Sequence, residues 1–147
     1  MTPGATDLIL LMLSFISIGA GIASSGIALS ISMSAYAACD AERRGAAFIP
    51  AVMAGSQGLY SFAIAFLMIQ ALPDAWESSA TLFKIAAAGP VCGIPCLLSA
   101  IGQAKTAAAC IKSINQGTMT TGGSLLAAGM PEFYALVGLG AGFLVMQ

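Results

Sequence analysis

Long apolar runs separated by short polar clusters dominate the chain. The runs cover residues 8–39, 46–72, 85–111 and the stretch that ends at Gln147, and the third contains Lys105. An α-helix needs about 20 apolar residues to cross a bilayer core of about 30 Å. Because every run reaches that length, the pattern predicts an all-α membrane protein with four transmembrane helices.

Three polar clusters separate the runs, at residues 40–45, 73–79 and 112–123. Their Gly, Pro, Ser and charged residues are typical of short connections. The four helices are therefore expected to pair as two hairpins, over about residues 7–72 and 82–147. Together they form a single membrane domain of residues 1–147.

The two hairpins resemble each other, which indicates an internal duplication. Residues 37–39 (Ala-Ala-Cys) match residues 108–110 with an offset of 71, and Gln57 stands opposite Glu132 with an offset of 75. The longer last loop accounts for the difference. Duplicated hairpins of one orientation are typical of parallel repeats in membrane proteins.

Composition excludes several classes of protein. Charged residues make up 7 % of the chain, whereas a soluble domain carries about 25 %, so a soluble or disordered chain is excluded. A net charge of −1 with five cations excludes nucleic-acid binding. Histidine is absent, so we expect no His-based catalysis and no cofactor. Cys92 and Cys96 lack further Cys or His ligands nearby and are expected to be packing residues.

The few charges predict an orientation. Cations gather in the first and third connections and just before the third, whereas the first residues and the second connection are mainly acidic. By the positive-inside rule, the cation-rich side faces the cytoplasm. We therefore expect a multi-pass protein of the cell membrane with both termini on the non-cytoplasmic side, and no cleaved signal peptide. The cations are Arg43, Arg44, Lys105 and Lys112, and the opposite side holds Asp7, Asp74, Glu77 and Lys84.

Small residues recur every four positions in the first run, at Ser17, Gly21 and Ser25. This pattern lets helices approach closely in lipid. It fits packing within one four-helix unit or packing between copies in an oligomer, and we favour the oligomer.

Glu132 is the only charged residue between Ser113 and Gln147. A carboxylate at bilayer depth costs at least about 2.5 kcal/mol and marks a functional site by default. We expect no Lys or Arg at its depth, so it must hold a proton or a bound cation. A plain interhelical hydrogen bond is the structural alternative. Gln57, Ser56 and Gln103 lie in neighbouring runs and supply the oxygen ligands that hard cations prefer.

Three motifs resemble those of the proteolipid (K or c) subunit of V-type rotary ATPases. Residues 55–67 (GSQGLYSFAIAFL) are similar to its second-helix motif, residues 100–109 (AIGQAKTAAA) to its third-helix motif and residues 132–138 (EFYALVG) to its ion-carrying Glu motif. The resemblance covers nearly the whole chain. It implies an oligomeric ring of identical subunits that is not an enzyme by itself but translocates ions within an ATP-hydrolysing rotary complex.

The resemblance to the sodium-transporting members also implies a Na⁺ site. Na⁺ is expected rather than H⁺, because two glutamines and a hydroxyl exceed what a protonated Glu needs. Ser56 replaces the usual Thr, and Ala54 replaces a Pro near the carbonyl ligand, so the loosening of the helix is expected to come from Pro50. The ligands implied are Glu132, Gln57, Gln103, Ser56 and the Met53 carbonyl, with Tyr60 bonded to the Glu.

The resemblance implies three further partners: a stator subunit with an Arg, central-stalk subunits at the cytoplasmic loops and membrane lipid. Two other classes stay open from the residues alone. One is a small four-helix cation or multidrug antiporter with an essential membrane Glu. The other is a purely structural membrane protein.

Overall fold

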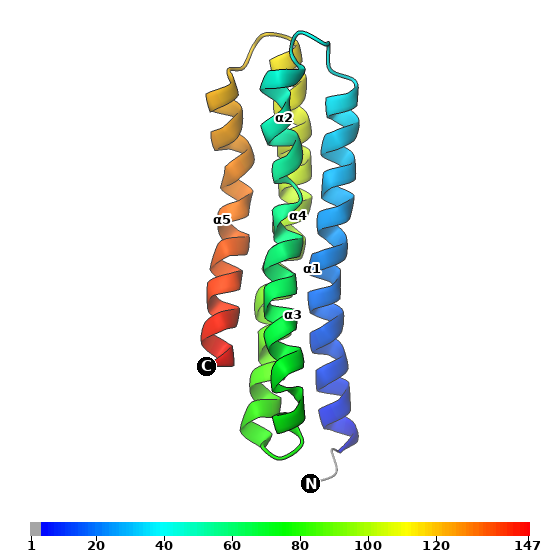
Figure 1. Cartoon of the computed structure of the whole chain (residues 1–147), viewed down its shortest axis with the longest axis vertical. Helices are drawn as coiled ribbons and strands as arrows, with labels where there is room; N and C mark the ends of the chain where they lie inside the picture. Colours follow the sequence, from blue (N-terminus) through cyan, green and yellow to red (C-terminus); the bar gives the residue numbers. More distant parts are fainter. Residues whose placement is uncertain (1–3) are drawn as a thin grey trace.

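The computed structural model describes residues 4–147, which form a long bundle of five helices (Figure 1). Helices α2 and α3 follow one another along a single span, so four spans are long and apolar enough to cross a membrane. The predicted all-α class with four spans is thereby confirmed. The helices are α1 (Ala5–Ala37), α2 (Arg44–Met53), α3 (Ser56–Ala75), α4 (Ser79–Asn115) and α5 (Thr121–Met146).

The second and third connections are shorter than the polar clusters predicted, whereas the first keeps its length and begins two residues earlier. Helix α3 continues through Pro73 to Ala75, and α4 begins at Ser79, so the second connection is only residues 76–78. The Ser78 hydroxyl caps α4 by accepting a hydrogen bond from the Thr81 amide at 3.3 Å. Some residues of the polar cluster at 73–79 therefore lie inside α3 or α4. Composition alone does not show where the helices end.

The second span is interrupted, whereas the sequence predicted one helix over residues 46–72. The break falls at Ala54–Gly55, four residues beyond Pro50. A proline disturbs the turn before it, and α2 continues through Pro50 to Met53, so the expected loosening by Pro50 does not account for the break. The Ser25 hydroxyl of α1 donates to the Gly55 carbonyl at 2.6 Å, and Ser32 donates to the Ala51 carbonyl at 2.6 Å. Helix α1 thus satisfies carbonyls around the break.

Helix α4 is central and shares its most extensive contact with α1. Two glycines of α4 make this approach possible. A Cβ at Gly89 would collide with the Ser14 backbone, and one at Gly93 with the Ser17 carbonyl and the Ile18 amide nitrogen. Backbone atoms cannot move aside cheaply, so both positions require glycine.

The small residues of α1 fall into two sets, one buried inside the chain and one exposed on its outer face. Gly21 and Ser25 are buried within the chain, which confirms packing inside one unit. Gly19 and Gly26 are exposed, and a Cβ at either would meet no atom within 4 Å. The second pair leaves a smooth outer face on α1.

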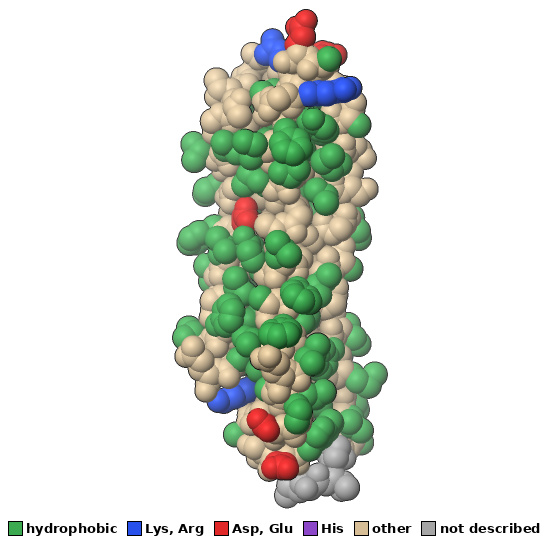
Figure 2. Space-filling model, in the orientation of Figure 1, with side chains coloured by type: hydrophobic (Ala, Val, Ile, Leu, Met, Phe, Trp, Pro, Cys, Tyr) green, Lys and Arg blue, Asp and Glu red, His purple; other side chains and the backbone are tan. Residues whose placement is uncertain are grey.

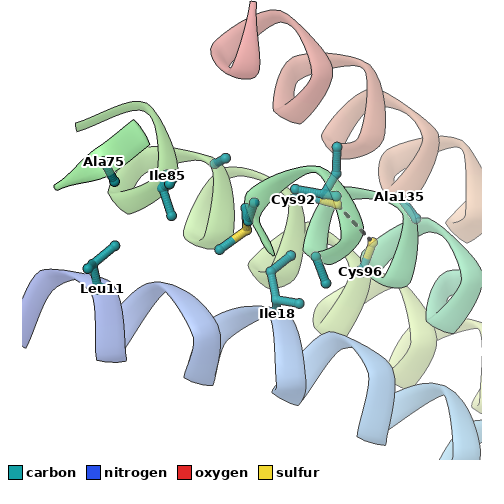
Figure 3. Close-up of a cluster of buried hydrophobic side chains, with 11 residues drawn as sticks. Leu11, Ile18, Ala75, Ile85, Cys92, Cys96 and Ala135 are labelled. Carbon is teal, nitrogen blue, oxygen red and sulfur yellow. Dashed lines mark hydrogen bonds between the residues drawn. The ribbon is translucent and has the colours of Figure 1, made fainter. Parts of the chain in front are cut away.

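The described residues contain three clusters of the apolar core, and one of them lies near the first and third connections (Cys39, Ala47, Ala51, Ile111 and Ile114). Towards the chain termini the core contains large side chains such as Ile18, Ile64 and Met68, and the buried Cys92 and Cys96 thiols lie 3.9 Å apart within it (Figure 3). Nearer the middle it consists of four alanines. These small side chains bring the helices together and leave room for polar groups between them. The four are Ala28, Ala54, Ala100 and Ala104.

Charged side chains gather at the two ends of the bundle, and acidic atoms also lie part-way along its side (Figure 2). At the end that holds the first and third connections, Asn115 joins both hairpins. Its side-chain oxygen accepts hydrogen bonds from the Asp40 amide at 2.8 Å and the Cys39 thiol at 3.2 Å. Gly117, whose φ of 71° suits glycine, turns the chain after α4 and lies against the Arg43 guanidinium.

Candidate functional site

Glu132 lies on α5 and faces α3 and α4. The Tyr60 hydroxyl of α3 donates to one carboxylate oxygen at 2.6 Å, and the Gln103 amide of α4 donates to the other at 3.4 Å. The Glu132 side chain is half-buried, whereas Gln103 has no exposed surface. Three helices therefore converge on the only charged side chain of α5.

A chain of amides extends from Glu132 into the bundle. The Gln103 nitrogen also donates to the Ala128 carbonyl at 2.9 Å. Since a carbonyl only accepts, this contact fixes which end of the Gln103 amide carries the hydrogens. The Gln103 oxygen then accepts from the Gln57 nitrogen. Gln57 on α3 and Glu132 on α5 thus flank Gln103.

Gln57 has an oxygen without a hydrogen-bond donor. Its side chain is fully buried, and its Oε1 has no partner among the described residues. Both hydrogens of its nitrogen are directed elsewhere, one to Gln103 and one to the Ser99 hydroxyl at 3.3 Å. A buried unpaired oxygen is costly, and it offers a lone pair to a cation or a water molecule.

Ser56 and Met53 lie at the break between α2 and α3. The Ser56 hydroxyl donates to the Met53 carbonyl at 3.0 Å, and both residues are half-buried. Neither forms a hydrogen bond to Glu132 or to the two glutamines in the described part of the chain. The structure therefore brings together Glu132, Gln103, Gln57 and Tyr60, and it pairs Ser56 with Met53 beside Tyr60.

Sequence reasoning missed Ser99. Its hydroxyl donates to the Pro131 carbonyl at 2.6 Å and accepts from Gln57 at 3.3 Å. Ser99 thereby connects Pro131, the residue before Glu132, to the two glutamines through hydrogen bonds. Helix α5 continues through Pro131 without a break. The available signal was its spacing, because Ser99 lies four residues before Gln103 and so shares its helix face.

The expectation that no basic residue lies near the depth of Glu132 needs correction. Lys105 follows Gln103 by two residues, which is only about 3 Å along the axis of α4. Two residues also turn an α-helix by about 200°. Lys105 accordingly lines a groove between α4 and α1 rather than the site, so the Glu132 carboxylate gains no cation from it.

The arrangement is suited to reversible cation binding. Its oxygens come from a carboxylate and two neutral amides, and the Gln103 amide presents its nitrogen to Glu132 and its oxygen to Gln57. Such oxygens are the ligands of hard cations. Among the described residues, no group of three or more Cys, Asp or Glu side chains could hold a metal, so the site is not a cluster of acids.

In a comparison with known proteins, the match to a protein family lies in the second hairpin. No curated protein matches the chain. Residues 86–145, which include Gln103 and Glu132, match the family model that describes the C subunit of ATP synthase.

Proposed function

We propose that the chain is the ion-carrying subunit of a membrane rotor ring in a V-type ATPase, and that it carries Na⁺ rather than H⁺. The observation that supports this most is the single carboxylate of the α5 helix, held by a tyrosine and a glutamine next to an unpaired buried Gln57 oxygen. The match of the second hairpin to the C subunit of ATP synthase supports the rotor part of the proposal.

The mechanism rests on neutralising Glu132. A bare carboxylate enters hydrocarbon only at high cost, whereas a carboxylate that holds a cation does not. Identical copies of the chain would form the ring, and each would pass through lipid with its site filled. An arginine on a stator subunit would displace the ion when a site returns to the protein interface.

The contacts favour Na⁺ over H⁺. A protonated Glu132 would have to donate its hydrogen, but the Gln103 nitrogen that faces it can only donate. Tyr60 is then the sole contacting group that could accept. A sodium ion instead needs several oxygens and no donors, and the Gln57 oxygen is free to serve. Ser56 and the Met53 carbonyl would complete the shell by turning towards the ion.

The proposed orientation follows from the charges. The end with Arg43, Arg44 and Lys112 would face the cytoplasm and meet the central stalk, and both termini would lie on the non-cytoplasmic side. One carboxylate for every four spans gives few ions per turn of the ring, which suits an ATP-driven pump better than a synthase. The antiporter alternative gains no support from the match to the family model.

Carbodiimide labelling of Glu132 tests the choice of ion. These reagents modify a protonated carboxyl group, so bound Na⁺ should slow labelling at fixed pH. We expect protection that increases with sodium concentration and is absent with choline in its place. Protection by raised pH alone, without any effect of sodium, would assign the site to H⁺ and overturn the sodium proposal.

Replacing Gln103 should weaken sodium binding. In Gln103→Ala the Glu132 carboxylate loses one donor and the Gln57 amide loses its acceptor. Hydrogen bonds to charged groups contribute about 1.5–3 kcal/mol, so the sodium concentration for half-protection should rise by at least about tenfold. Unchanged protection would remove Gln103 from the site.

Replacing Ser99 tests the residue that sequence reasoning missed. Ser99→Ala leaves the Pro131 carbonyl without its donor and should raise the half-protecting sodium concentration by about three- to tenfold, as expected for one hydrogen bond. Ser99→Thr keeps the hydroxyl and should bind nearly normally. Ser61→Ala is a matched control, since that buried hydroxyl has no hydrogen-bond partner among the described residues. Equal affinities in all three variants would show that Ser99 does not position Glu132.

A further inference from the structure

Ser25 of α1 contacts α3 on both sides of Gln57. Its hydroxyl donates to the Gly55 carbonyl at 2.6 Å. A Cβ at Gly58 would lie only 3.0 Å from both the Cβ and the hydroxyl oxygen of Ser25. Gln57 lies between these two contacts in the first turn of α3, and its buried amide donates to Gln103. The start of α3 is thus held against α1 at the residues that orient the Gln57 amide.

This anchor matters because the second span is interrupted directly before Gln57. The Gly55 amide donates to the Val52 carbonyl, three residues back, at 3.3 Å, whereas the bonds of an α-helix reach four residues back. With the regular bonding interrupted, α2 does not by itself fix how far α3 is turned about its axis. A rotation of the first turn of α3 would carry the Gln57 amide away from Gln103, and the contacts with Ser25 restrain that rotation.

Helix α1 supplies no hydrogen bond to the candidate site itself. Among the described residues, the side-chain partners of Glu132 and of the two glutamines come from α3, α4 and α5. Ser32, two turns beyond Ser25 on α1, holds the other side of the break by donating to the Ala51 carbonyl of α2. Helix α1 therefore acts on the site through the backbone of the second span.

We propose that Ser25 is a positioning residue for ion binding. Its hydrogen bond to the Gly55 carbonyl sets the direction of the Gln57 amide. Through Gln57 it also sets the Gln103 amide, whose nitrogen faces Glu132. A site whose groups are held in place before the ion arrives binds more tightly, because less ordering accompanies binding. This inference rests on the proposed function, since it concerns the affinity of the same site.

The test is a double-mutant cycle on the full chain, measured by sodium protection of Glu132 against carbodiimide. Ser25→Ala should raise the half-protecting sodium concentration by about three- to tenfold, the size of one hydrogen bond. Gln57→Ala should raise it at least as much. Adding Ser25→Ala to Gln57→Ala should cause no further rise, because the residue that Ser25 positions is gone. A merely structural role would give additive effects, and additivity would overturn the proposal.

Two further variants separate the hydrogen bond from general packing. Ser24 is the neighbouring residue and is equally buried, with 5 % of its surface exposed, but its hydroxyl donates to the Gly21 carbonyl within α1 at 2.9 Å. Ser24→Ala should therefore bind sodium like the wild type. Ser25→Cys fills the space of the serine with a weak donor, so it should weaken binding as Ser25→Ala does. Wild-type affinity in either Ser25 variant would overturn the proposal, as would an equal loss in Ser24→Ala.

The same cycle distinguishes this inference from the choice of ion. If raised pH alone protects the wild type, the sodium proposal fails, and the midpoint of the pH dependence becomes the measured value. A shift of that midpoint in Ser25→Ala that disappears in the Gln57→Ala background would uphold the positioning role without sodium. An unchanged midpoint would overturn it. Labelling that responds to neither sodium nor pH would overturn both proposals.

Discussion

Glu132→Gln is expected to abolish ion-coupled transport while the chain still folds and assembles. The amide has nearly the same shape as the carboxylate and can still accept the Tyr60 hydrogen bond, so the packing of α3, α4 and α5 is kept. It has no charge with which to attract a cation or to be displaced by a stator arginine. Transport in a reconstituted rotary complex should therefore fall to background, together with carbodiimide labelling.

The control for this variant is Glu42→Gln, which removes a carboxylate from the exposed connection before α2. It should transport normally. The oligomeric state and thermal unfolding of Glu132→Gln in detergent should match those of the wild type. Sodium transport at the wild-type rate in Glu132→Gln would remove this residue from the mechanism and the proposed function with it.

The second large effect should come from Gly93→Ala. One added methyl group would meet the Ser17 carbonyl and force α1 away from α4. Overpacking a tight contact costs about 1–3 kcal/mol, and here backbone atoms of the most extensive helix contact are displaced. We expect a clearly lower unfolding temperature in detergent, with Gly89→Ala behaving similarly because it faces the Ser14 backbone.

Gly26→Ala and Gly19→Ala provide matched controls, because nothing lies within 4 Å of a Cβ at either position. In the isolated chain both should unfold close to the wild-type temperature. A Gly93→Ala variant as stable as these controls would mean that α1 and α4 lie farther apart than described. Comparing the four variants also separates packing within one chain from packing between copies, since only the outer-face glycines are available to a neighbour.

The spans were predictable from the sequence because each is a long run of apolar residues, a signal that depends on local composition. The break at Ala54–Gly55 was not, although Pro50 marked the region. Carbonyls near this break accept hydrogen bonds from the Ser25 and Ser32 hydroxyls of α1. Such donors come from a different helix, and no local pattern places them.

The candidate site also contains residues that the sequence predicts and contacts that it does not predict. Glu132 could be found because a lone carboxylate in an apolar run is conspicuous, and Gln57 and Gln103 because amide side chains are rare inside the spans. The outward direction of Lys105 and the tie between Ser99 and Pro131 depend on helix rotation and on which faces meet. Serine is common in these spans, so Ser99 stood out only once its partners were known.

In the proposed rotor, the Asn115 side chain would have a mechanical consequence. Its oxygen accepts hydrogen bonds from both the Asp40 amide and the Cys39 thiol, so the end of α4 is joined to the connection between α1 and α2. Torque exerted by a shaft on either connection would then be shared by both hairpins.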